Sequence, residues 1–202
     1  MSPEPYDAFD ISVPAAGVVV EEGRGALPFH LIHGESLVAA AAWAAGEAGI
    51  DLIDLTVSWS ALAERGDALV LHDALCPMTP PDFLAACADG AAVEDRVVVG
   101  VRPVTDTVKE VAAGPGGDVI GATVDRDGLV LVCSPVVLPP AVVADLLGDG
   151  ADLPTTDFAA LVELLRERYG DDRVALVAAP PEARRVASDE DIAVLQALTD
   201  PR

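Results

Sequence analysis

The sequence is poor in lysine, cysteine and aromatic residues. Its 202 residues include one lysine, Lys109, and 12 Lys and Arg stand against 34 Asp and Glu, for a formal net charge of −22. Nucleic acids and anionic membranes would repel such a chain, so we expect neither as a partner. The three cysteines are widely spaced and odd in number, which argues against a disulfide framework or a structural zinc site.

The sequence also lacks a long hydrophobic run and a basic-then-apolar leader. The longest apolar run, residues 37–45, is about half of a membrane span. We therefore predict a cytoplasmic protein. A hydrophobic content of 51% excludes a disordered chain, and the length suits one domain over residues 1–202.

Apolar segments typical of strands alternate with segments typical of helices. We expect strands within residues 11–20, 51–58, 68–71, 96–101, 129–132 and 173–178, and helices at 36–47, 79–88, 139–147, 157–169 and after Ser188. Thr79 and Ser188 are the expected N-caps. Residues 104–112 and 118–124 flank a glycine-rich turn and predict a protruding hairpin. The order predicts an α/β sandwich with ligands near the carboxyl ends of the strands.

Four short segments carry groups that could do chemistry. Asp73 ends a buried strand, where a carboxylate can hold a metal ion or substrate hydroxyl, or simply cap the next turn. Thr107 and Lys109 can hold a phosphate or lie on the solvent-exposed edge of a hairpin. Without further evidence, the second interpretation is favoured.

Arg184 and Arg185 can bind an anion or pair with the acidic start of the last helix. A structural role is favoured for the His-x-x-His at residues 30–33, and the Gly-Arg-Gly at residues 23–25 is too short to indicate a phosphate loop.

Several longer motifs carry a family resemblance. Residues 103–109 read Pro-Val-Thr-Asp-Thr-Val-Lys, close to P-V-T-D-T-I-K, and 123–129 match T-V-D-R-x-G-L. Residues 72–77 are similar to H-D-A-A-R-P, 132–135 stand where Q-T-P is found, and 156–163 and 184–192 follow T-D-D-A-S-L-V-E and I-K-I-T-x-P-E-D-L. Together with residues 13–17, matched to the first strand and turn, they resemble the methylerythritol phosphate cytidylyltransferase family of the non-mevalonate isoprenoid pathway.

The resemblance implies a Rossmann-like, three-layer α/β/α nucleotidyltransferase sandwich with a projecting β-arm, residues 103–128. Family members attack the α-phosphate of CTP with the acceptor's phosphate, aided by Mg²⁺, and release pyrophosphate. They are usually homodimers in which one subunit's arm completes the other's acceptor site. The resemblance implies substrate-binding roles for five residues, the first of them also a candidate Mg²⁺ ligand: Asp73, Thr107, Lys109, Arg126 and Ser134.

The departures from the family pattern fall on the nucleotide side. Ala15, Ala16 and Gly17 are the expected remnant of the nucleotide-binding turn. The family continues there with G-x-G-x-R-M and P-K, and later has G-G-x-x-R-x-x-S-V, whereas this sequence has none of these. Cys76 replaces the arginine of the H-D-A motif. Arg185 replaces a late lysine and is the candidate catalytic residue.

Three functions follow from this pattern. In the favoured one, the chain is a cytidylyltransferase-like protein impaired by loss of its CTP-binding loop, and it acts as a binding or regulatory partner. It would form a homodimer through the arm or a heterodimer with an intact homologue. In the alternative, it is an active enzyme that transfers CMP from CTP to methylerythritol phosphate or a related polyol phosphate, with Arg24 and Arg185 holding the triphosphate. The third is a small-molecule phosphate binder without a protein partner.

Overall fold

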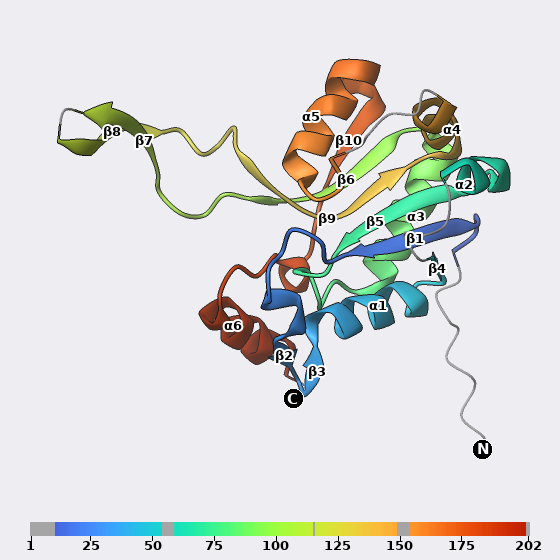
Figure 1. Cartoon of the computed structure of the whole chain (residues 1–202), viewed down its shortest axis with the longest axis horizontal. Helices are drawn as coiled ribbons and strands as arrows, with labels where there is room; N and C mark the ends of the chain where they lie inside the picture. Colours follow the sequence, from blue (N-terminus) through green and yellow to red (C-terminus); the bar gives the residue numbers. More distant parts are fainter. Residues whose placement is uncertain (1–10, 54–58, 115, 149–153, 201–202) are drawn as a thin grey trace.

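The computed structural model describes residues 11–53, 59–114, 116–148 and 154–200. Six strands form a mixed sheet in the order β10-β6-β9-β5-β1-β4 (Figure 1). Five of these strands run parallel to one another, and β9 is antiparallel to its neighbours β5 and β6. The strand bounds are β1 Ala15–Val20, β4 Asp51–Leu52, β5 Ala68–Asp73, β6 Val97–Pro103, β9 Val130–Leu138 and β10 Val174–Ala178.

Helices cover both faces of this sheet and so make three layers (Figure 1). On one face lie α1 (Leu37–Glu47) and α3 (Pro81–Glu94), and on the other lie α2 (Trp59–Arg65), α4 (Pro140–Gly148) and α5 (Phe158–Tyr169). The last helix, α6 (Asp189–Thr199), packs beside the small β2–β3 hairpin, Leu31–Ile32 and Glu35–Ser36. Single 3-10 turns occupy Leu27–Phe29 (η1), Asp171–Arg173 (η2) and Pro181–Ala183 (η3).

The wholly apolar strand sequences are explained by burial on two faces. In β6, Val97 and Val99 join the core beneath α4 and α5, whereas Val98 joins the core above α1 and α3. In β5, Leu69 and Val70 divide between the two cores in the same way. Strands that are covered on both sides need apolar residues at successive positions, and this confirms the predicted α/β sandwich.

Most predicted elements are present, with shifted ends. The Ser188 cap is confirmed, because its hydroxyl accepts the Asp191 N–H. The Thr79 cap is wrong: α3 begins after Pro80, and the Thr79 hydroxyl instead donates to the Cys76 carbonyl in the preceding turn. The predicted strand at 51–58 is found at Asp51–Leu52, and its residues 54–58 lie outside the described part of the chain.

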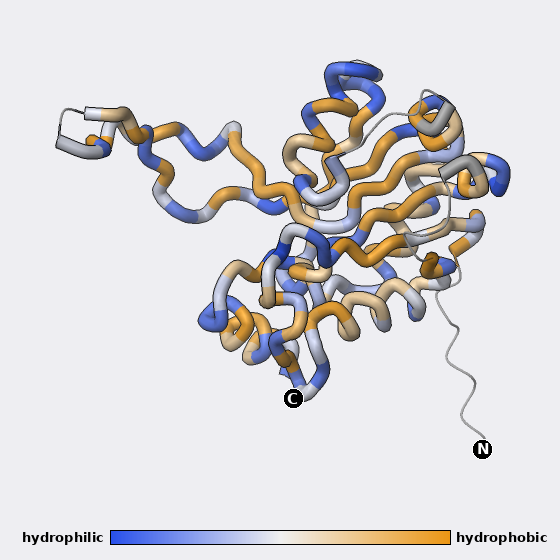
Figure 2. Tube along the Cα trace, viewed as in Figure 1, coloured by the Kyte–Doolittle hydropathy of each residue, from blue (hydrophilic) through white to orange (hydrophobic). Residues whose placement is uncertain are grey.

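The predicted hairpin is confirmed as an arm that extends away from the three layers (Figure 1). It consists of β7 (Val108–Gly114) and β8 (Gly117–Val124), which pair only with each other among the described residues. Its apolar side chains are exposed: Val111 is 64% and Ile120, its cross-strand partner, 73% exposed. Figure 2 shows hydrophobic residues along this arm, outside the sandwich.

Candidate functional site: an arginine-rich cavity at the strand ends

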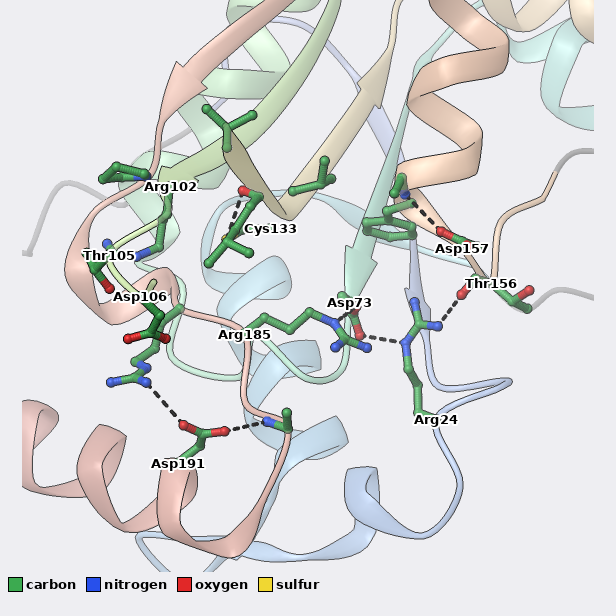
Figure 3. Close-up of a pocket in the computed structure, with 18 residues that line it drawn as sticks. Arg24, Asp73, Arg102, Thr105, Asp106, Cys133, Thr156, Asp157, Arg185 and Asp191 are labelled. Carbon is green, nitrogen blue, oxygen red and sulfur yellow. Dashed lines mark hydrogen bonds and ion pairs between the residues drawn. The ribbon is translucent and has the colours of Figure 1, made fainter. Parts of the chain in front are cut away.

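A cavity of about 860 Å³ lies where β1, β5 and β6 end, at the carboxyl edge of the sheet (Figure 3). Its floor comes from the end of β5, and its walls come from the loop after β1, the start of β9, the N-terminus of α5 and the segment before α6. This is the edge at which open α/β sheets bind their ligands. Four arginines and four aspartates line it: Arg24, Arg102, Arg184, Arg185, Asp73, Asp106, Asp157 and Asp191.

Asp73 lies between two of these arginines. Arg24 Nε donates to Asp73 Oδ1 at 3.0 Å, and Arg185 Nε donates to Asp73 Oδ2 at 2.9 Å (Figure 3). The carboxylate side chain is only 3% exposed, and its Oδ1 also accepts the Leu75 N–H at 3.0 Å. Each carboxylate oxygen is therefore engaged by a guanidinium, and we call this arrangement the arginine bracket.

Arg24 is the more buried of the two arginines in the bracket. Its side chain is 7% exposed, its Nη1 donates to the Thr156 carbonyl, and its guanidinium lies 5.8 Å from the Phe158 ring centroid. The loop that presents it turns through Gly23 and Gly25, whose φ angles of 75° and 63° favour glycine. The Gly-Arg-Gly sequence thus bends the chain directly after β1 and directs an arginine back toward Asp73.

A buried serine and histidine support Asp73 from behind. The Ser134 hydroxyl accepts the Asp73 backbone N–H at 3.1 Å and makes a short hydrogen bond with His72 Nδ1. Burial lowers the pKa of His72 to about 4, so its ring is neutral at pH 7. At Gly100, a Cβ would collide with the Ser134 carbonyl oxygen, so glycine is needed for β9 to approach β6 here.

The remaining polar groups of the cavity are largely committed. Arg184 Nη2 pairs with Asp191 at 3.1 Å, and Arg102 Nη1 donates to the Ala179 carbonyl at 3.2 Å. Asp157 caps α5 by accepting the N–H groups of the next helical residues. Burial raises the pKa of the Cys133 thiol in the cavity wall, which disfavours a thiolate nucleophile there.

The donor set does not fit a resident Mg²⁺ ion. Both oxygens of Asp73, the candidate ligand, are held by arginines. Within the described residues there is no group of three or more His, Cys, Asp or Glu side chains that could hold a metal ion. Mg²⁺ requires free oxygen ligands, and two guanidinium groups beside the carboxylate oppose a cation.

The structure brings together only some of the residues that the sequence singles out. Asp73 and Arg185 meet in the cavity, and Ser134 lies buried behind Asp73. Thr107, Lys109 and Arg126 do not line the cavity: all three are exposed on or beside the arm. Lys109 Nζ donates to the Thr123 hydroxyl at 2.6 Å, and Arg126 donates to the Thr105 carbonyl.

Ala15, Ala16 and Gly17, the expected remnant of the nucleotide-binding turn, do not form a turn. These residues lie buried inside β1, paired with Ala68, Leu69 and Val70 of β5, because the apolar strand continues to Val20. The loop after β1 instead holds the Gly-Arg-Gly of residues 23–25 and then Pro28. The loop therefore presents Arg24 between two glycines, close to the end of β1.

The other doubtful motifs are resolved by their contacts. Arg184 pairs with the acidic start of α6, as one of its two interpretations predicts, whereas Arg185 turns to Asp73. His30 pairs with Asp189 at 2.6 Å and His33 with the Thr199 hydroxyl at 2.7 Å, so both histidines tie the β2–β3 segment to α6. All three cysteines are free and buried.

Sequence reasoning missed Arg102 and undervalued Arg24. Arg102 directly follows the buried Val97–Val101 run, and position at a strand's carboxyl end is the signal that could have found it. The flanking glycines of Arg24 were the corresponding signal, once the end of β1 is placed at Val20.

A three-layer α/β/α sandwich with a cavity of charged residues at its strand ends and a projecting hairpin has the nucleotidyltransferase-like fold that the sequence predicts. A crystal structure of 2-C-methyl-D-erythritol 4-phosphate cytidylyltransferase from Thermus thermophilus is similar to the chain with a TM-score of 0.62 and 20% identity. That similarity covers 94% of this chain and 100% of the other, and at this identity it concerns the fold.

Sequence comparison identifies the family. The family model described as IspD, 2-C-methyl-D-erythritol 4-phosphate cytidylyltransferase, matches residues 54–200. A cytidylyltransferase of that name from Rhodococcus opacus is 30% identical over 188 residues, which are 90% of this chain and 71% of the relative. One from Nocardia farcinica is 34% identical over 76% of this chain, which spans 63% of that relative's length. The chain belongs to the 2-C-methyl-D-erythritol 4-phosphate cytidylyltransferase family.

The described helices include none that is both long and apolar enough to cross a membrane.

Proposed function

We propose that this chain binds phosphorylated ligands of the CTP and polyol phosphate classes in the arginine-rich cavity and transfers the cytidylyl group poorly. Family membership supports the ligand class. The cavity holds four arginines and four aspartates, and the point at which Arg24 and Arg185 both donate to one carboxylate supports phosphate binding. The cavity volume of about 860 Å³ is within the range of small-molecule sites.

The arginine bracket is the observation that supports the proposed loss of catalytic activity. Phosphoryl transfer depends on positioning and on charge stabilisation, and each lost donor typically costs roughly 100- to 1,000-fold in rate. Here Asp73 neutralises Arg24 and Arg185, and both of its carboxylate oxygens are occupied by these pairs. Leu27 and Pro28 stand where the family has P-K, so the loop after β1 offers one arginine, Arg24, where the family has an arginine and a lysine.

Arg24 is the observation that favours the second candidate, an active nucleotidyltransferase. It enters the cavity from the loop after β1, on the opposite side of Asp73 from Arg185 (Figure 3). If both arginines turned from Asp73 to a triphosphate, the loop would regain part of its charge. In that case Arg24→Ala combined with Arg185→Ala should abolish the activity.

The arm supports a second part of the proposal, assembly with another subunit. Thr107, Lys109 and Arg126 keep the family's motifs but lie outside this chain's own cavity. A two-stranded hairpin is only marginally stable alone in water, and apolar residues such as Val111 and Ile120 are exposed on this one. We propose that the arm packs against a second copy or an intact homologue and contributes its polar residues to that subunit's acceptor site.

Pyrophosphate release tests the proposed impairment. The purified chain is incubated with CTP, methylerythritol phosphate and Mg²⁺, beside the Thermus thermophilus enzyme as a working reference. We expect a rate at least about 100-fold below the reference. A matching rate would contradict impairment, and its loss in the Arg24→Ala and Arg185→Ala double variant would then establish the second candidate.

Assembly is measured separately by sedimentation of the chain alone and mixed with the reference enzyme. The assembly proposal predicts a dimer in one of the two samples that Val111→Ser with Ile120→Ser dissociates. A monomer in both samples would contradict it.

A further inference from the structure

The arginine bracket resembles a phosphate site that is filled by a side chain of the protein itself. This inference rests on the proposed phosphate binding and adds how the ligand enters. We infer that Arg24 and Arg185 form a phosphate subsite, that Asp73 is its resting occupant, and that a ligand's terminal phosphate binds there by exchanging with the Asp73 carboxylate.

The geometry of the bracket suits one oxyanion. The two Nε–H groups approach different oxygens of a single carboxylate, at 3.0 Å and 2.9 Å. The donors therefore converge on the space of one small anion, and guanidinium groups recognise carboxylates and phosphates with the same paired N–H geometry. A tetrahedral phosphate offers at least the two acceptor oxygens that Asp73 now supplies.

The two arginines differ in solvent exposure, and this difference sets the order in which a ligand meets them. Arg24 is 7% exposed and is fixed by the Thr156 carbonyl and the Phe158 ring. The Arg185 side chain is 38% exposed and lines the cavity. A ligand phosphate thus meets Arg185 first from the solvent side, and Arg24 is the fixed donor that completes the subsite.

Asp73 retains partners when it leaves the bracket. Its Oδ1 also accepts the Leu75 N–H, and its backbone N–H is held by the Ser134 hydroxyl. The resting occupant also has a structural reason to exist, since a buried guanidinium without an anion is strongly unfavourable. The consequence is self-competition: ligand affinity is reduced by the fraction of time that Asp73 fills the subsite.

A variant pair separates self-competition from a general effect of charge. Asp73→Asn removes the competing charge from the bracket. Asp106→Asn removes one charge from an exposed residue in the wall of the same cavity. Inorganic phosphate and pyrophosphate are titrated by calorimetry without any divalent metal, so that no metal ligand role of Asp73 enters the measurement.

We expect Asp73→Asn to bind these anions about tenfold more tightly than the unchanged chain. Asp106→Asn should give a much smaller gain, and Arg185→Ala should lose the binding. Equal gains in the two aspartate variants, or weaker binding by Asp73→Asn, would overturn the exchange.

If Asp73→Asn does not fold, the unchanged chain still decides the question. Its arginine Nε–H signals are followed by nuclear magnetic resonance during phosphate titration, with Arg24→Lys and Arg185→Lys variants for assignment. Exchange predicts that the chemical shifts of both Nε–H signals change in parallel and level off as phosphate saturates the site. Signals whose chemical shifts do not change would overturn it. Anion binding without exchange removes only this inference, whereas no anion binding at all removes the proposed function as well.

Discussion

The cavity and the arm differ in how much of the family's sequence pattern they retain and in where their side chains lie. The arm keeps the family's motifs nearly letter for letter over residues 103–109, yet the strands of its hairpin carry exposed side chains that line no part of the cavity. The cavity has lost the glycine-loop pattern, yet it gathers four arginines at the strand ends. Retained motif residues are therefore found in both regions: Asp73 and Asp106 line this chain's own cavity, whereas Lys109 is exposed on the arm, where we propose that it acts on a second subunit.

This contrast predicts that single changes destabilise the cavity far more than the arm. The largest effect is expected for Asp73→Ala, which leaves the buried Arg24 guanidinium without its anion. We expect a loss of about 3–5 kcal/mol in the free energy of unfolding, measured by urea denaturation. Asp106→Ala is the matched control and should change it little. A loss below about 1 kcal/mol, which is typical of an exposed ion pair, would contradict a buried bracket.

The second prediction concerns pH and the histidine behind the bracket. The folded pKa of His72 is about 4, below the model-peptide value of 6.5, so between these values the unfolded chain binds more protons than the folded one. Its contribution to stability is complete above pH 6.5 and declines as the pH falls to about 4, by about 3 kcal/mol in all. Denaturation curves for His72→Gln should lack this part of the pH dependence. Parallel curves for the two proteins would contradict it.

The third prediction compares one glycine of each region. Gly100→Ala drives a methyl group into the Ser134 carbonyl oxygen and should cost about 1–3 kcal/mol, because β9 must move. Gly116→Ala, in the turn of the arm, meets nothing within 4 Å and should be nearly neutral. Thermal unfolding of the two variants measures the difference. Equal shifts in melting temperature would mean that β9 does not approach β6 closely at Gly100.

The smallest effect is expected for Lys109→Ala on the arm. Lys109 is exposed and makes a hydrogen bond with Thr123, so the free energy of unfolding should change by no more than about 0.5 kcal/mol. Phosphate affinity of the cavity should also stay unchanged, as calorimetry can show. A large loss of affinity in the isolated subunit would place Lys109 at this chain's own site.

The parts of the fold that were predictable depend on local patterns. The apolar runs that end at Val101 and Leu71 identify two buried strands, and the glycines between two β-rich segments identify the arm. The strand-end position of Asp73 follows from the same pattern. Element ends were less predictable, since the Thr79 hydroxyl satisfies a turn instead of the helix it precedes.

The bracket could not be predicted in this way, because it joins distant parts of the chain. Arg24 lies 49 residues and Arg185 112 residues from Asp73 in sequence. No local periodicity reports such pairings. The misplaced turn at Gly17 has a related cause: β1 continues to Val20, beyond the family-like Pro-Ala-Ala-Gly, and the sheet pairing with β5 decides where the strand ends.

The most direct test is a crystal structure of the unchanged chain with bound pyrophosphate. Exchange at the bracket predicts one phosphate group within hydrogen-bond distance of the Nε atoms of both Arg24 and Arg185, with the Asp73 carboxylate turned away from at least one of them. Pyrophosphate bound elsewhere in the cavity, with both arginines still paired with Asp73, would contradict the exchange.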